Sequence, residues 1–236
     1  MFKRIVFKPT VLLALVAALS LGLSGVASAA VINGTPLDDQ RIRGTSSDDQ
    51  MHGLAGNDNL YGWDPDGPYS VVDGNDTIWG DEGKDMLFGG FGNDSLLGGV
   101  GDDYLIGHSG DDWMRGDEGD DRLSGEGGND SLGGGPGNDR LDGAWGDDRV
   151  GVTGASGQDL LFGGRFVNND GNDTIIATGD PARDDERDGV YCGDGYDTAY
   201  LTPAPWYMWY VSDYFVDSSG TPTSSAGAGC ENVIWQ

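Results

Sequence analysis

Apolar residues recur at every ninth position over most of this chain. Written in nines from Val71, the sequence reads VVDGNDTIW, GDEGKDMLF, GGFGNDSLL, GGVGDDYLI, GHSGDDWMR, GDEGDDRLS, GEGGNDSLG, GGPGNDRLD and GAWGDDRVG, without a gap. Place eight of each nonapeptide is apolar, whereas places seven and nine mix polar, charged and aromatic residues. Because side chains alternate between the two faces of a strand, this pattern predicts a three-residue strand over places seven to nine with place eight pointing inward.

The repeat extends beyond this uninterrupted run at both ends. Residues 44–52 (GTSSDDQMH) and 53–61 (GLAGNDNLY) keep the same register, and residues 63–73 between the two parts read as an inserted loop. Downstream, residues 154–162 (GASGQDLLF) and 168–176 (NNDGNDTII) carry the motif after slips in spacing. The expected core is the set of place-eight residues: Met51, Leu60, Ile78, Leu87, Leu96, Leu105, Met114, Leu123, Leu132, Leu141, Val150, Leu161 and Ile175.

The first six places of each repeat predict a tight turn. Glycine at places one and four, and often at place two, permits positive φ and close backbone approach. Strands of three residues cannot bury a core singly, so the repeats are expected to stack into a solenoid. Two nonapeptides make one coil of 18 residues, which places equivalent residues of alternate repeats about 4.8 Å apart.

Charge adds a requirement that stacking alone does not meet. The chain has 40 acidic and 13 basic residues and a net charge of −27. Aspartate recurs at place six, and unscreened carboxylates stacked in a column would repel one another. Ca²⁺ binds six to eight carboxylate and carbonyl oxygens, whereas Mg²⁺ prefers strict octahedra and Zn²⁺ or copper prefers His or Cys. The sequence therefore predicts several calcium ions between the turns, and the negative charge argues against nucleic acid as a partner.

The motif G-G-x-G-x-D-x-U-x resembles the nonapeptide of the RTX, or haemolysin-type, calcium-binding repeat family. The resemblance implies an all-β fold, a right-handed parallel β-roll with Ca²⁺ between adjacent turns. Ser47 stands where the repeat starting at Gly44 should have its second glycine. Carried over to place six, the expected metal ligands are Asp49, Asp58, Asp76, Asp85, Asp94, Asp103, Asp112, Asp121, Asp130, Asp139, Asp148, Asp159 and Asp173.

Residues 1–29 are expected to form a cleavable secretory signal peptide. Lys3, Arg4 and Lys8 precede an apolar run over residues 11–23, and the small residues Ala-Ser-Ala follow at 27–29. The alternative, a membrane anchor, would need about 20 apolar residues. The sequence thus predicts an extracellular protein without membrane insertion. Its expected parts are an N-terminal cap strand (residues 30–43), the β-roll (44–178, with the inserted loop 63–73) and a C-terminal cap (179–236).

Cys192 and Cys230 are the only cysteines. In an exported protein an isolated pair favours a disulfide, with two unpaired thiols as the alternative. The segment around Cys192 and the final Cys-Glu-x-Val also resemble the C-terminal pattern of some secreted bacterial calcium-repeat proteins. A disulfide-stapled pair of strands is therefore expected to cap the last coil.

The function that unites these features is a calcium-binding module that folds on binding the metal and has a non-catalytic structural or interaction role. An alternative is a calcium-rigidified adhesin that binds a glycan or cell-surface partner through the aromatic residues 206–216 (WYMWYVSDYFV), which could equally pack as the cap. An enzyme is a weaker alternative, because no nucleophile–base or metalloprotease motif is present. Polysaccharide-acting enzymes with parallel β-helices have longer coils that contain less glycine. The oligomeric state and the biological partner stay open.

Overall fold

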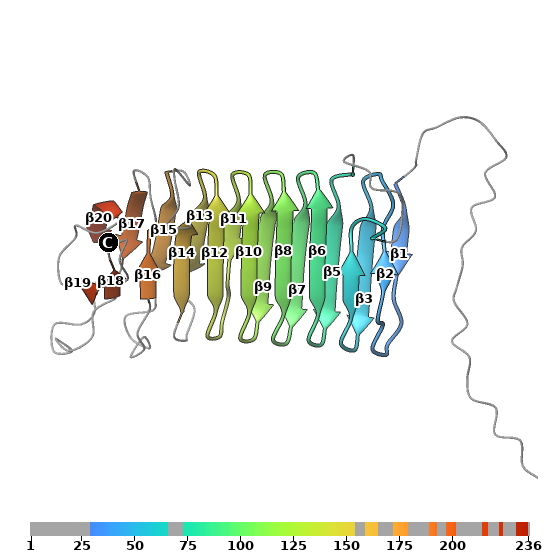
Figure 1. Cartoon of the computed structure of the whole chain (residues 1–236). Coiled ribbons are helices and arrows are strands. Elements are labelled where there is room, and N and C mark those ends of the chain that lie inside the picture. Colours follow the sequence, from blue (N-terminus) through green and yellow to red (C-terminus); the bar gives the residue numbers. More distant parts are fainter. Residues whose placement is uncertain are drawn as a thin grey trace, which may run out of the picture.

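The computed structural model describes residues 29–65, 73–153, 159–164, 172–178, 189–192, 197–201, 214–216, 222–223 and 230–235. Strands are the only regular elements in these ranges, and they stack side by side in a solenoid (Figure 1). No helix in the described ranges is long and apolar enough to cross a membrane. The all-β, parallel solenoid predicted from the repeat is confirmed.

The strands form two ten-stranded sheets, and the chain alternates between them as far as residue 216. The strand over residues 222–223 stays in the same sheet as the strand over residues 214–216 and pairs with it antiparallel, whereas the other pairings are parallel. Sheet A contains, in spatial order, β1 (Val31–Asn33), β3 (Gln50–Ala55), β5 (Thr77–Glu82), β7 (Ser95–Val100), β9 (Trp113–Glu118), β11 (Ser131–Gly133), β13 (Arg149–Thr153), β15 (Thr174–Thr178), β17 (Asp197–Leu201) and β20 (Cys230–Trp235). Sheet B runs from β2 (Ile42–Arg43) through β4 (Asn59–Tyr61), β6 (Met86–Phe91), β8 (Tyr104–Ser109), β10 (Arg122–Gly127), β12 (Arg140–Trp145), β14 (Leu160–Gly164), β16 (Gly189–Tyr191) and β18 (Tyr214–Val216) to β19 (Pro222–Thr223).

Each coil is 18 residues long through the regular part of the chain. Ile78 pairs in parallel with Leu96, and Leu96 pairs in turn with Met114. The register from Met51 to Ile78 is longer by nine residues, because the chain between Gly62 and Asp76 carries an insertion. Gly62 nevertheless lies against the carboxylate of Asp76, so it takes the place-one role for that repeat. The solenoid absorbs the insertion without losing its register.

Many strands of the repeats are longer than the sequence predicts. Eight of them, β3, β5 to β10 and β12, cover six residues from place seven of one repeat to place three of the next, whereas β4 and β11 cover places seven to nine alone. The pleat continues through the glycines: in β7, Leu96 and Gly98 are buried while Ser95, Leu97 and Gly99 are only partly buried. Places six, eight and one therefore point inward in succession, and the expected three-residue strand was too short because glycine at places one and two does not end the ladder.

The core consists of the residues that the periodicity predicts. All thirteen place-eight side chains are between 0% and 3% exposed. They stack coil upon coil between the two sheets, and a single row of aliphatic residues contributed by each sheet fills the interior. This confirms the prediction that place eight carries the hydrophobic core.

Glycine serves different purposes at different places of the repeat. Most described place-four glycines have positive φ, for example 136° at Gly101, and so do most residues at place two, including His108 (80°) and Ala144 (79°). Place-one glycines do not appear in the positive-φ region, which corrects the expectation for that place. Their requirement is steric: a Cβ at Gly98 would lie 2.5 Å from Oδ2 of Asp103 and 2.6 Å from the carbonyl oxygen of Gly116.

The C-terminal strands continue the two sheets. β17 pairs with β15 and β20 pairs with β17 in sheet A, both in parallel, while β16 follows β14 in sheet B. Cys192, directly after β16, is buried. The side chain of Cys230 lies outside the described residues, so the disulfide with Cys192 stays a prediction, as do the domain boundaries.

Candidate metal centre

The place-six aspartates form two columns inside the solenoid, one beneath each row of turns. All thirteen predicted ligands are between 0% and 3% exposed. In each column, Oδ1 of one aspartate accepts a hydrogen bond from the backbone N–H of the aspartate one coil earlier, at 2.7–2.9 Å. One column contains Asp49, Asp76, Asp94, Asp112, Asp130, Asp148 and Asp173, and the other contains Asp58, Asp85, Asp103, Asp121, Asp139 and Asp159.

The second carboxylate oxygen has no donor in most of these residues. Oδ2 of each is buried and accepts no hydrogen bond within the part of the chain that the structure describes. At Asp103 this oxygen and the carbonyl oxygen of Gly116 converge on the space left by Gly98. Buried oxygens that face one another without a hydrogen between them are unfavourable unless a proton or a cation intervenes. The residues concerned are Asp58, Asp76, Asp85, Asp94, Asp103, Asp112, Asp121, Asp130, Asp139 and Asp148.

Burial strongly raises the pKa of these carboxyl groups. Removal from water is the largest cause, the charges of neighbouring aspartates add to it in most cases, and the backbone hydrogen bond opposes it. The pKa values rise to about 8 for Asp76, Asp112 and Asp148, to about 7 for Asp103, Asp121 and Asp139, and to about 6 for Asp85, Asp94 and Asp130. Burial therefore disfavours the charged form of these carboxyl groups, and a bound proton or cation would offset that effect.

The donor set fits a hard cation that also accepts carbonyl oxygen. No three His, Cys, Asp or Glu side chains are grouped as a metal cluster among the described residues. Carboxylate and backbone carbonyl oxygens lie close together here, as at Asp103 and Gly116, and both oxygen types suit Ca²⁺. The two histidines lie elsewhere, on the outer faces, where His52 pairs with Asp81 at 3.1 Å and His108 with Glu126 at 3.0 Å.

Place five carries a second, exposed ladder. The side-chain oxygen of each Asn or Asp accepts a hydrogen bond from the backbone N–H of the place-five residue one coil later, as in Asp111 N–H to Asn93 Oδ1 at 2.9 Å. These hydrogen bonds run from the later coil to the earlier one, opposite to those of the buried columns. Lys84 also pairs with Asp102 on this exposed edge. Asn93, Asp102 and Asp120 thus brace neighbouring turns, a role that the sequence did not specify.

Two aspartates belong to the columns in addition to the thirteen expected ligands: Asp39, which the sequence did not indicate, and Asp197, which the sequence places at the ligand position of a degenerate repeat. The N–H of Asp173 donates to Oδ1 of Asp197 at 2.9 Å, and the N–H of Asp39 donates to Oδ1 of Asp58 at 2.7 Å. Asp197 lies at the sixth position of the degenerate repeat CGDGYD, which begins at Cys192. Asp39 follows Gly34 at the regular spacing, but the next repeat begins ten residues after Gly34 rather than nine, which hid it. Conversely, Asp159 and Asp173 keep their places despite the slips before them.

Several expectations fall on residues outside the described ranges. The signal peptide over residues 1–29 is one, except for Ala29, and the aromatic residues 206–213 are another. Both therefore stay predictions. The adhesin alternative rests on the second of these segments.

Comparison with known families agrees with the geometry of the columns. The sequence profile of the RTX calcium-binding nonapeptide repeat matches in four copies, over residues 37–64, 72–96, 97–132 and 115–150. These ranges include the aspartates from Asp39 to Asp148. No curated protein matches the chain.

Proposed function

Because the chain belongs, over residues 37–150, to the RTX calcium-binding nonapeptide repeat family, we propose that it is an exported structural module that folds when Ca²⁺ fills its aspartate columns. The ligands are the thirteen place-six aspartates, joined at the two ends by Asp39 and Asp197. The aspartates whose Oδ2 has no hydrogen-bond donor supply that oxygen, and backbone carbonyls of the turns complete the coordination. Bound calcium supplies the positive charge that the columns need at neutral pH.

The observation that carries the proposal is the row of buried Oδ2 atoms without a hydrogen-bond donor. Desolvation of so many carboxylates opposes folding, and glycine adds backbone entropy that folding must overcome. A cation that binds only the stacked form shifts the equilibrium toward it, so metal binding and folding become one reaction. Outside cells, millimolar calcium suits sites with Kd values of about 10⁻⁴–10⁻³ M.

Circular dichroism with and without calcium tests this function. At pH 7.5 the chain is expected to show little strand signal in excess chelator and to gain it cooperatively on addition of Ca²⁺, because each coil is stabilised mainly by its neighbours. Calorimetry should give several calcium ions per chain, and Mg²⁺ at the same concentration should not substitute. Equal strand content in chelator and in calcium would overturn the proposal.

Neutralising one buried aspartate is expected to have opposite effects with and without the metal. Asp103→Asn keeps an acceptor for the N–H of Asp85 but removes a buried charge. In calcium the variant should raise the midpoint of calcium-induced folding severalfold, because a charged ligand is lost. In chelator at pH 7.5 it should fold more readily than the unaltered chain, because a desolvated charge is gone.

Asp102→Asn is the matched control for this substitution. Asp102 is the neighbouring residue, is exposed, and pairs with Lys84 at the surface. It should change the midpoint of calcium-induced folding only slightly, and it should leave folding in chelator nearly unchanged. Similar shifts for the two variants would mean that place six does not supply the ligands.

Export through the signal peptide, the non-catalytic role and the disulfide between Cys192 and Cys230 are parts of the same proposal. Lys3, Arg4 and the apolar run over residues 11–23 support export. In an oxidising compartment a disulfide would tie the buried Cys192 to β20 and fasten the last coils. Mass spectrometry of the secreted protein, with and without reduction, tests both the cleavage after Ala29 and the pairing.

A further inference from the structure

The outer face of sheet B carries a groove that calcium binding does not explain. The groove has a volume of about 210 Å³ and crosses β8, β10 and β12. Its position follows from the residues at place nine along this sheet. From β6 to β14, the place-nine side chains are large at Phe88 and Ile106, and short at Ser124 and Asp142. On β14 the side chain at this place is large again, at Phe162. The groove is the dip between two raised, largely aromatic parts of the same face.

The aromatic borders of the groove are ordered stacks. Tyr61 stacks on Phe88 with ring centroids 4.8 Å apart, and Phe162 stacks on Tyr191 at 4.5 Å. Tyr104 stands at the margin of the groove with 37% of its surface exposed. Exposed rings of this kind give flat apolar surfaces, on which the C–H face of a sugar ring can pack.

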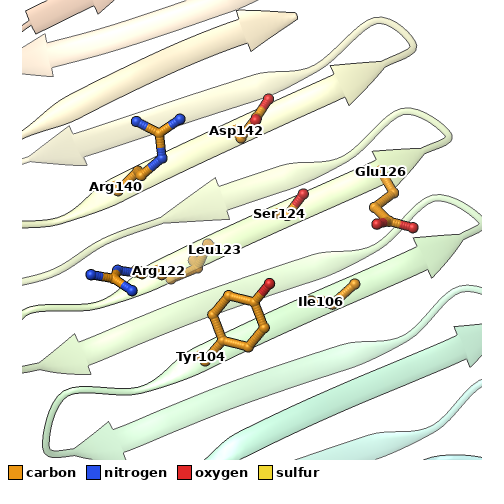
Figure 2. Close-up of a pocket in the computed structure, with 8 residues that line it drawn as sticks. All are labelled: Tyr104, Ile106, Arg122, Leu123, Ser124, Glu126, Arg140 and Asp142. Atoms are coloured by element: carbon orange, nitrogen blue, oxygen red, sulfur yellow. The ribbon is translucent and has the colours of Figure 1, made fainter. Parts of the chain in front are cut away.

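Two arginines stand side by side in this groove. Arg122 pairs in register with Tyr104 on one side and with Arg140 on the other, so that the three side chains lie on three neighbouring strands (Figure 2). Like charges directly opposite on adjacent strands repel. Neither arginine forms an ion pair within the described part of the chain, although Arg140 lies 4.2 Å from the ring centroid of Phe162.

The two adjacent arginines stand out in a chain of net charge −27 with 13 basic residues. Arg43 pairs with Asp64, Lys84 with Asp102, and Arg115 with Asp117, whereas Arg149, on β13 of the opposite sheet, has no ion pair among the described residues. Two guanidinium groups one strand apart present a fork of N–H donors that a carboxylate fits well. Within the same groove, Ser124 and Glu126 offer acceptors for hydroxyl groups.

From this combination we propose that the groove is a binding site for an acidic saccharide. The carboxylate of a uronate residue binds Arg122 and Arg140, and the sugar ring packs on Tyr104. Hydroxyl groups of the sugar donate to Ser124 and Glu126. The site is separate from the calcium columns, which lie inside the solenoid, and none of the residues 206–216 is part of it.

Isothermal calorimetry on the calcium-loaded full chain tests this site, with a hexamer of galacturonic acid as the probe. The fully methyl-esterified hexamer, which has no charge, is the second probe. We expect the acid to bind, and the ester to bind at least about tenfold more weakly, because charge-assisted hydrogen bonds to the arginines are lost. Failure of the acid to bind, or equal binding of the ester, would overturn the proposal.

We expect about tenfold or greater loss of affinity for the acid in each of Arg122→Ala and Arg140→Ala. Tyr104→Ala should weaken the binding of both the acid and the ester. Arg149→Ala is the matched control, since Arg149 occupies the same place seven on β13 of the opposite sheet. It has the same effect on net charge and should leave binding unchanged. Equal losses in Arg122→Ala and Arg149→Ala would mean that overall charge, not this groove, governs binding.

Circular dichroism in calcium accompanies each titration. A variant that retains the strand signal and loses binding supports the site. If the unaltered chain shows no calcium-dependent strand signal, the proposed calcium-dependent folding is wrong. If the strand signal is present and the acid does not bind, only the saccharide site is wrong.

Discussion

Lowering the pH from about 8 to about 5 in excess chelator is expected to restore strand structure that the metal-free chain lacks at the higher pH. The nine buried carboxyl groups with folded pKa values of about 6 to 8 are the cause. A proton neutralises each carboxylate and lets Oδ2 donate to a facing carbonyl oxygen. Protons would thus do in acid what Ca²⁺ does at neutral pH.

The sign follows from the direction of the pKa shifts. An aspartate in the unfolded chain has a pKa near 3.8, and folding raises that pKa, so the folded form binds more protons between these values. The stabilisation is fully present below about pH 3.8 and is lost as the pH rises through 6 to 8. Each such group contributes about 1.4 kcal/mol per pH unit within its window.

The measurement is a pH titration by circular dichroism in chelator, paired with proton release on addition of calcium at about pH 5.5. Calcium should displace protons from the acid-folded form. Asp112→Asn removes a group with a pKa of about 8 and should flatten the pH dependence. Asp102→Asn should leave the pH dependence unchanged, because Lys84 lowers the pKa of the exposed Asp102 carboxyl group. Strand content that is independent of pH in chelator would contradict the electrostatic account of the columns.

The sequence predicted the interior well because a strict period leaves little freedom. Leu96, Leu105 and Met114 are buried at place eight as the alternation requires, and Asp94, Asp103 and Asp112 lie inside, two residues before them. Once place eight points inward, the pleat sends place six inward as well. The prediction of stacked aspartates therefore depended on spacing alone.

The sequence failed where backbone geometry, not side-chain polarity, decides. Glycine at places one and two looked like the end of a strand, yet the ladder continues through Gly98 and Gly99. Nothing in the composition distinguishes a glycine needed for positive φ, such as Gly99, from one needed to leave room for an aspartate, such as Gly98. Asp39 was missed because one extra residue before Gly44 disturbed the count, although the hydrogen bonds tolerate it.

Two adjacent glycines allow the tightest test of the stacking. Gly128, at place four, has φ of 137°, and a Cβ there would overlap the carbonyl oxygen of Gly110 one coil earlier. Gly127, its neighbour at the end of β10, has no such φ, and the nearest heavy atom to its added Cβ is the carbonyl oxygen of His108 at 3.7 Å. The same methyl group is thus forbidden at one residue and accommodated at the next.

In calcium, Gly128→Ala is expected to lower the free energy of unfolding by roughly 3–5 kcal/mol, because about 1–2 kcal/mol of backbone strain adds to a clash that only separation of the coils relieves. Gly127→Ala should be neutral or stabilise by about 0.4–1 kcal/mol, since alanine restricts the unfolded chain more than glycine does. Urea unfolding followed by circular dichroism measures both values. Because Gly128 also supports Gly146 of the next coil, its replacement should lower the cooperativity of calcium-induced folding as well. Equal effects of the two substitutions would mean that successive turns are not in backbone contact, and cooperative folding through contacts between neighbouring coils would lose its physical basis.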